Sequence, residues 1–197
     1  MVLIVRLLAL SRLSGTAFFL PTRGDMHFYN GWALRIVQGQ WTDHVAFYGL
    51  PLYAYLLAGI YKFFGYNPFI PGLLQGCLEA GSAVLLYKTA LRVFSGARAP
   101  NQSHVPYGNR AELIGLMAAL SWAFFVPAQA YSVVLMPTVW LVFVFWFVVW
   151  QVVRAEPALT PLRCAFLGAL IGFAAMGIAT ILFLIPLIAA ALISAPT

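Results

Sequence analysis

The chain has 197 residues, 63% of them hydrophobic and 8% charged, and its mean hydropathy is +0.91. Soluble domains are roughly 45–50% apolar and about 25% charged, so this composition excludes an ordinary soluble protein and predicts an all-α, polytopic transmembrane helix bundle. The net charge of +6 comes from eleven Lys and Arg residues scattered singly between apolar runs, so they form no basic face for nucleic acid. We therefore expect the lipid bilayer as a partner, no nucleic acid, and a single transmembrane domain over residues 1–197.

Residues 2–20 form the first apolar segment and have two open interpretations. The segment is long enough to span a membrane, but it contains Arg6 and Arg12. An arginine near the middle of the bilayer costs about 2.5–3.5 kcal/mol on insertion scales. The alternative is an external helix whose preceding span is missing.

The next segment, residues 21–69, is the predicted first external loop, and residues 26–39 within it predict a helix in the membrane interface. An apolar stripe recurs there at helical spacing: Met26, Tyr29, Ala33 and Ile36. Asn30 falls elsewhere on the helical wheel, among the polar residues. An amphipathic helix of this kind is expected to lie on the membrane rather than cross it.

Residues 51–66 (PLYAYLLAGIYKFFGY) are short for a membrane span and also predict an interfacial helix. Their four tyrosines and Lys62 suit a helix at headgroup depth, where amphipathic rings and snorkelling amines are comfortable. If the helix lies flat, the loop before it stays on the external side. If it crosses instead, that loop faces the cytoplasm, so the two interpretations differ in topology.

Five later runs are apolar enough to be membrane spans: about 70–91, 113–130, 133–153, 164–177 and 180–195. A single helix over 164–195 would be about 48 Å long and would overshoot a hydrocarbon core of about 30 Å. We therefore predict a hairpin that turns at residues 176–180. The last run ends without a basic flank, so we expect the domain to be incomplete at its carboxyl end.

Lys and Arg residues in short loops predict the orientation, because basic loops stay on the cytoplasmic side. The loop after residue 91 and the loop at 154–163 contain five such residues: Arg92, Arg98, Arg110, Arg154 and Arg163. The connections at 66–70 and 130–133 contain none. The basic loops are therefore predicted to be internal and the other two external.

Asp25 is one of only five acidic residues and stands at the start of the predicted helix over 26–39. A carboxylate there suits an N-cap, because it satisfies free N–H groups and meets the positive end of the helix dipole. The functional alternative is a catalytic carboxylate on the external face. The residues alone leave both interpretations open, and one side chain can serve in both.

Glu79 lies about halfway along the span predicted at 70–91, where an acidic residue is a functional candidate by default. The alternative is a neutral or hydrogen-bonded side chain against a neighbouring helix, with Gln75 one turn earlier on the same face. Two small-residue ladders predict close helix packing: Gly72 with Gly76, and Gly168 with Gly172.

Other residue types with possible chemistry give no site. Cys77 and Cys164 fall within predicted spans without the spacing of a metal site and are expected to be structural. The three histidines, His27, His44 and His104, match no metal motif. Asp43 beside His44 is typical of a solvated loop. No glycine-rich phosphate loop occurs. The sequence indicates no cofactor and leaves the need for a divalent metal open.

Three stretches carry a resemblance to a known family: GDMHFYNGWALRIVQGQW at 24–41, FYGLPLYAYLLAGIYKFFGYNP at 47–68, and LLYKTALRVFSG at 85–96. Their order resembles the amino-terminal half of GT-C glycosyltransferases, which include the protein O-mannosyltransferases and the lipid A aminoarabinose transferase. The specific part covers about residues 24–66. The resemblance implies a polyprenyl-phosphate sugar donor and a reaction on the external face.

In that family an acidic residue of the first external loop is the general base or positions the acceptor hydroxyl, and the resemblance carries this role to Asp25. It also implies substrate contacts by nearby tyrosines, here Tyr29, Tyr48 and Tyr53. Three departures stand against the family pattern. Met26 replaces a second acid, the stretch 135–138 has no acid, and the turn at 176–180 has no cation for a donor phosphate.

We therefore expect a membrane glycosyltransferase that moves a sugar from a polyprenyl-phosphate donor to an unidentified acceptor. Its predicted location is the inner or plasma membrane, multi-pass, with the active face external. The alternative is a polytopic transporter or a noncatalytic membrane subunit, which the missing acids and the missing cation favour.

Overall fold

The fold is a set of helices that the computed structural model describes over residues 1–14, 16, 19, 21–42, 50–95, 107–154 and 160–193. They are α1 Val2–Ser14, α2 Gly24–Val37, α3 Leu52–Phe64, α4 Phe69–Ser95, α5 Tyr107–Phe124, α6 Val126–Val133, α7 Thr138–Val153, α8 Pro161–Ala175, the 3-10 helix η1 Ala179–Phe183 and α9 Leu184–Ile193. These residues contain no strand. The all-α class is therefore confirmed.

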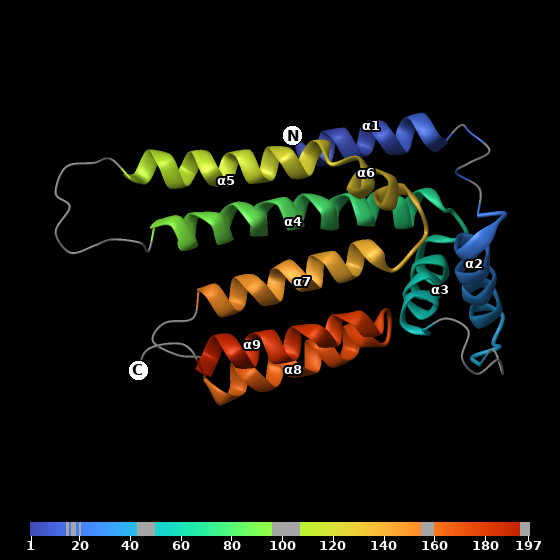
Figure 1. Ribbon diagram of the computed structural model, residues 1–197. Helices are drawn as coiled ribbons and strands as arrows, with labels where there is room; N and C mark the ends of the chain where they lie inside the picture. Colours follow the sequence, from blue (N-terminus) through green and yellow to red (C-terminus); the bar gives the residue numbers. More distant parts are fainter. Residues whose placement is uncertain are drawn as a thin grey trace.

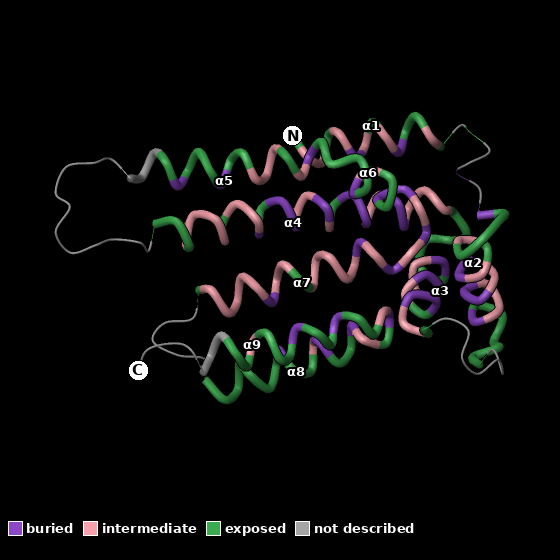
Figure 2. The backbone as a smooth tube through the Cα atoms, in the orientation of Figure 1, coloured by how far each residue is buried: buried purple, intermediate pink, exposed green. Residues whose placement is uncertain are grey.

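The longer helices run side by side, and α2 with α3 lies across one end of them (Figure 1). α4 is the centre of this arrangement, because it contacts α1, α5, α6 and α7, and α3 at its first turns. Buried residues concentrate on α2, α3, α6 and the first half of α4 (Figure 2). The best-packed part of the molecule is thus the end at which the crosswise helices sit.

Within the described residues, α4 is the one unbroken helix long and apolar enough by itself to cross a membrane. Residues 110–124 of α5 pass the same length and composition test only together with α6, across a bend of 54°. The other apolar helices are shorter, with 10–17 residues: α3, α7, α8 and the stretch 179–190.

Two of the predicted spans have the wrong bounds, and a proline explains each difference. The span predicted at 113–130 is not one helix, because α5 ends at Phe124 and α6 begins at Val126. Pro127 has no N–H to donate to the Ala123 carbonyl four residues earlier, and its ring crowds that carbonyl. The span predicted from residue 133 begins instead at Thr138, since Pro137 disfavours the helical conformation in the residues before it.

The hairpin predicted within 164–195 is present. α8 ends at Ala175, backbone N–H groups of residues 176–178 bond back to carbonyls of its last turn, and η1 packs on α8 as the chain returns. Buried apolar side chains of α7, α8, η1 and α9 form one cluster: Val148, Leu167, Ile171, Ala174, Ile181 and Leu184. The turn of this hairpin lies at the same end of the helices as α2 and α3 (Figure 1).

Only one of the two glycine ladders packs closely. A Cβ atom on Gly72 would lie 2.7 Å from the Leu10 Cδ1 atom, and one on Gly76 would lie 3.4 Å from the Arg6 Cβ atom. α1 therefore approaches α4 along this ladder, as predicted. The prediction for Gly168 and Gly172 is wrong, because a Cβ on either would meet no described atom within 4 Å and both residues are exposed.

Candidate functional site

Asp25 lies in the first turn of α2, and its side chain is exposed. The cap position belongs to Arg23, which is extended and makes no side-chain cap bond, so the N-cap interpretation of Asp25 is wrong in detail. The carboxylate still lies where the helix dipole favours a negative charge. Among the residues that the structure describes, no ion pair or hydrogen bond involves the Asp25 side chain. It is open to a ligand approaching from solvent.

α2 is held in place by a buried interface with α3. Its apolar stripe packs against the apolar face of α3, and the two faces form one cluster with Leu135: Tyr29, Trp32, Ala33, Ile36, Tyr53, Ala54, Leu57, Ala58 and Tyr61. The stripe predicted from helical spacing is therefore confirmed at Tyr29, Ala33 and Ile36, with Met26 partly buried beside it. This packing fixes α2, and with it the position of Asp25.

Asn30 is buried in this interface, although the sequence placed it on the polar side of the helix. Its Oδ1 atom accepts a hydrogen bond of 2.8 Å from the Tyr61 hydroxyl, and its Nδ2 atom donates one of 3.3 Å to the Tyr66 hydroxyl. Two phenols from α3 and its end thus satisfy an amide that would be costly to bury alone. Burial raises the pKa of Tyr61, which stays a neutral donor.

The tyrosines proposed to contact substrate lie in different surroundings. Tyr29 and Tyr53 are buried and their rings meet edge to face, with centroids 5.3 Å apart. The Tyr53 hydroxyl donates a 2.6 Å hydrogen bond to the Oε1 atom of Gln75. This geometry gives Tyr53 a packing role, and its substrate contact stays a prediction without support from position. Tyr48 lies outside the described residues.

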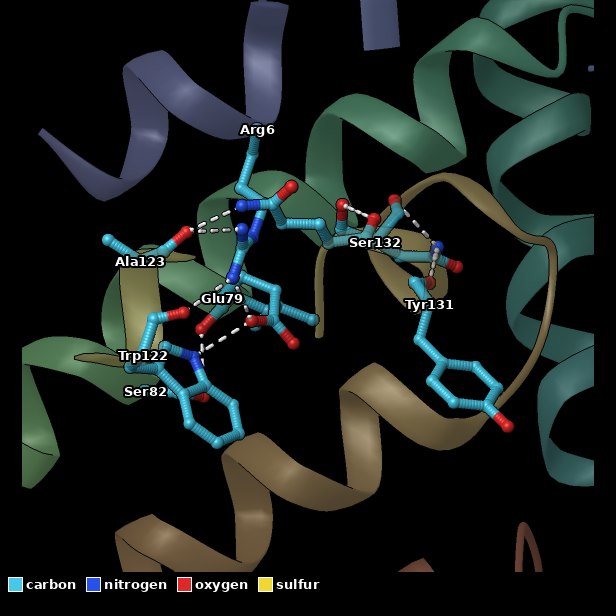
Figure 3. A network of polar contacts seen from close by, with 10 residues as sticks. Arg6, Glu79, Ser82, Trp122, Ala123, Tyr131 and Ser132 are labelled. Carbon is cyan, nitrogen blue, oxygen red and sulfur yellow. Dashed lines mark hydrogen bonds and ion pairs between the residues drawn. The ribbon is translucent and has the colours of Figure 1, made fainter. Parts of the chain in front are cut away.

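A second polar centre joins α1, α4 and the broken end of α5 (Figure 3). Arg6 is 1% exposed and donates from Nη1 to the Ala123 carbonyl at 2.9 Å and from Nη2 to the Trp122 carbonyl at 3.0 Å. The same Nη2 atom lies 3.3 Å from the Oε2 atom of Glu79, which is 2% exposed. That carboxylate oxygen also accepts a hydrogen bond of 2.8 Å from the indole Nε1 of Trp122.

The helix break explains why a buried arginine is needed here. Pro127 cannot donate to the Ala123 carbonyl, and the Trp122 carbonyl accepts only a long backbone bond of 3.4 Å from the Phe125 N–H, so both carbonyls can accept from a further donor. Arg6 supplies one, and the Gln129 Nε2 atom adds a bond of 3.0 Å to the same Ala123 carbonyl. The guanidinium in turn needs a counter-charge, which Glu79 provides. Glu79 therefore has hydrogen-bond partners on two neighbouring helices, Arg6 on α1 and Trp122 on α5. This agrees with the alternative interpretation of Glu79 as a side chain that is hydrogen-bonded to a neighbouring helix.

Gln75, one turn before Glu79, plays the equivalent part at the end of α6. It is fully buried, and its Nε2 atom lies 3.3, 3.1 and 2.9 Å from the carbonyls of Tyr131, Ser132 and Val134. Its Oε1 atom accepts the hydrogen bond from Tyr53. One face of α4 thus serves both broken helix ends, because Gln75 donates directly to the end of α6 and Glu79 holds the Arg6 side chain that donates to the end of α5. Through Tyr53 the same face is also tied to the crosswise helix α3.

Sequence reasoning placed Gln75 and Glu79 on one face but missed their partners. Arg6 is 73 residues from Glu79, and the partners of Gln75 are backbone carbonyls, which no side-chain pattern reveals. The usable signals were the two prolines, Pro127 and Pro137, because each predicts carbonyls in need of a donor. An arginine in an apolar helix is a candidate donor to carbonyls that a proline has left without a backbone partner.

The described residues offer no obvious metal centre. No three His, Cys, Asp or Glu side chains among them lie close enough together to hold an ion. Cys77 and Cys164 are unpaired and exposed on their helices. Asp43, His44 and His104 fall outside the described parts of the chain.

Comparisons with known proteins add no relative: no family model, no curated protein and no solved structure matches this chain.

Proposed function

We propose that the protein is a polytopic membrane glycosyltransferase of the GT-C type, which transfers a sugar from a polyprenyl-phosphate carrier to an acceptor on the external face. One observation carries the proposal. Asp25 is exposed at the start of α2, and α2 lies with α3 across one end of the long helices (Figure 1). This is the arrangement expected if two interfacial helices present a carboxylate at the membrane surface.

The distribution of cations supports an external position for that end. Six of the eleven Lys and Arg residues flank the opposite end, in or beside the loops after α4 and α7: Lys88, Arg92, Arg98, Arg110, Arg154 and Arg163. Four flank the end with α2 and α3: Arg12, Arg23, Arg35 and Lys62. Because the richer side is retained in the cytoplasm, Asp25 belongs outside.

Membrane insertion is supported by the length of α4. The 27 residues of α4 extend about 40 Å at 1.5 Å per residue, enough to cross a hydrocarbon core of about 30 Å. The buried ion pair removes the main objection to inserting α1, since its arginine is neutralised within the protein rather than exposed to lipid. α3 is as short as α1, with 13 residues, but it lies across the ends of the long helices and packs on α2 (Figure 1).

An apolar groove between α7, η1 and α9 suits the hydrocarbon tail of the donor. It has a volume of about 330 Å³ and is lined almost entirely by apolar side chains, including Leu141, Phe145 and Leu187. Ile178 and Thr180 line one end of the groove, in the turn after α8 that lies at the same end of the helices as α2 and α3 (Figure 1). A prenyl chain in this groove would place its phosphate at that same face of the molecule.

In the proposed reaction, the Asp25 carboxylate accepts the proton of an acceptor hydroxyl while the oxygen of that hydroxyl bonds to the anomeric carbon of the sugar. The bond from that carbon to the donor phosphate breaks, and polyprenyl phosphate leaves. The turn after α8 offers no cation for this phosphate. Arg23, which is exposed two residues before Asp25, is the described cation adjacent to the proposed base in sequence.

The break between α5 and α6 bears on the transporter alternative, because transporters bind ions at the ends of discontinuous helices. Here the carbonyls at the end of α5 and the Glu79 carboxylate hold the guanidinium of Arg6. A side chain of the protein thus occupies the position that a transported cation would need. This favours a transferase over a transporter.

The proposal is tested by direct detection of the reaction. The purified protein would be incubated in lipid with a panel of polyprenyl-phosphate sugars and crude acceptor, and released polyprenyl phosphate would be followed by mass spectrometry. Release that depends on both protein and acceptor supports a transferase. Uptake of a solute into vesicles without such release would support the transporter instead.

A further inference from the structure

The broken end of α5 has the composition of a cation site. Two carbonyl oxygens, of Trp122 and Ala123, and one carboxylate oxygen of Glu79 converge on the terminal nitrogens of one side chain (Figure 3). The carbonyls lie at a helix C-terminus, where the dipole adds negative potential. The carboxylate is nearly fully buried and carries the only formal negative charge in the set.

The site binds only the two terminal nitrogens of the Arg6 side chain. Nη1 and Nη2 make all the bonds to the site, whereas Nε, although buried, has no partner within the part of the chain that the structure describes. A ligand with two terminal amino groups would therefore make the same bonds without being tethered to α1. The tether mainly raises the effective concentration of the guanidinium at the site.

We propose that the end of α5 is a binding site for a guanidinium cation, formed by the Trp122 and Ala123 carbonyls and the Glu79 carboxylate, and that Arg6 is its resident, intramolecular ligand. The site goes beyond the glycosyl transfer proposed above and does not depend on it. A planar guanidinium presents a fixed fork of donors and is weakly hydrated, so it enters a buried site at a lower desolvation cost than an ammonium ion.

The position of the site gives its ligand a structural consequence. α1 approaches α4 closely at Gly72 and Gly76, and the guanidinium is the polar tie that joins the same helix to α5. When the ligand is lost, the buried carboxylate loses its counter-charge and the two carbonyls lose their charged donor, although the Trp122 indole, the Gln129 amide and the Phe125 N–H still donate to these three acceptors. The free energy of folding should then fall, and it should recover when a free ligand of the right shape binds.

The test is chemical rescue of Arg6→Ala in the whole chain, in detergent or nanodiscs. Loss of one partner of a buried ion pair should lower the unfolding temperature by about 10 °C. Guanidinium chloride at about tenfold over its dissociation constant should restore about 3–6 °C. Urea, sodium chloride and ammonium chloride at the same concentration should restore less than half as much.

Two controls separate the site from general salt effects. The double variant Arg6→Ala with Glu79→Gln should show no rescue by guanidinium, because the charged partner is gone. Arg12→Ala removes an exposed arginine of the same helix and should neither lower the unfolding temperature by more than about 2 °C nor respond to guanidinium.

Several results would overturn the proposal. These are rescue by ammonium or urea equal to that by guanidinium, rescue that survives Glu79→Gln, and an Arg6→Ala variant that does not fold with or without guanidinium. Arg6→Lys gives an independent test, since its single ammonium cannot repeat the fork of the two terminal nitrogens. It should unfold several degrees below the wild type, and equal stability would contradict guanidinium selectivity.

Discussion

Arg6 of α1 and Glu79 of α4 form a salt bridge of 3.3 Å with side chains that are 1% and 2% exposed. The pair is completed by the broken end of α5, whose carbonyls accept from the arginine and whose Trp122 indole donates to the carboxylate. One contact thus answers two questions that the sequence raises, namely how an arginine enters an apolar helix and why an acid lies in the middle of another.

The first prediction is that the two charges depend on each other. Glu79→Met leaves a buried guanidinium unpaired and should lower the free energy of unfolding by about 3–5 kcal/mol. The double variant Arg6→Met with Glu79→Met should cost less than the sum of the two single variants, with a coupling of about 1–3 kcal/mol. Chemical unfolding in detergent measures all four proteins, and Glu112→Met, at an exposed acid of α5, is the control with little effect. Strict additivity would mean that the pair is not coupled.

Gln75→Leu is the second prediction. The leucine has about the same size but leaves the carbonyls at the end of α6 and the Tyr53 hydroxyl without their partner. The expected loss is about 2–4 kcal/mol of unfolding free energy, and α3 should become more susceptible to limited proteolysis because it loses its tie to α4. The matched control is Gln40→Leu at an exposed position. Equal effects of the two substitutions would refute a capping role for Gln75.

The third prediction concerns topology. Single cysteines would be placed at Gln38, at the end of α2, and at Ser95, at the end of α4, in a background without Cys77 and Cys164. Both positions are exposed in the structure. An impermeant thiol reagent applied to intact cells should label Gln38→Cys and spare Ser95→Cys, with both labelled after the membrane is opened. The opposite pattern would invert the orientation and place Asp25 inside.

Local patterns predicted local structure well, and this is where the sequence was most informative. The stripe of α2 follows from the helical period, because one helix face must be buried somewhere and α3 is its next neighbour in the chain. The hairpin of α8 with η1 and α9 was predicted from the length of the apolar run at 164–195, which exceeds the length of one membrane-spanning helix. Both depend on residues close together in sequence.

Features set by distant contacts could not be predicted in the same way. Asn30 is buried because tyrosines of another segment satisfy it, and Gly168 is exposed although its spacing is the same as that of the packed ladder at Gly72. Spacing shows which residues share a face but not what lies opposite. The break at Pro127 was visible in the sequence, and its consequence for Arg6 follows only when both segments are placed.

The central claim, that Asp25 is the catalytic carboxylate, is tested most directly by turnover of Asp25→Asn per folded molecule. Asparagine keeps the size of the side chain but removes its charge and basicity, so transfer from a polyprenyl-phosphate sugar should fall by about 10²–10⁴-fold while the amount of folded protein stays near that of the wild type. Glu112→Gln removes an exposed carboxylate from the opposite end of the helices and should keep full activity. Near-normal transfer by Asp25→Asn would contradict the assignment of Asp25 as the catalytic base.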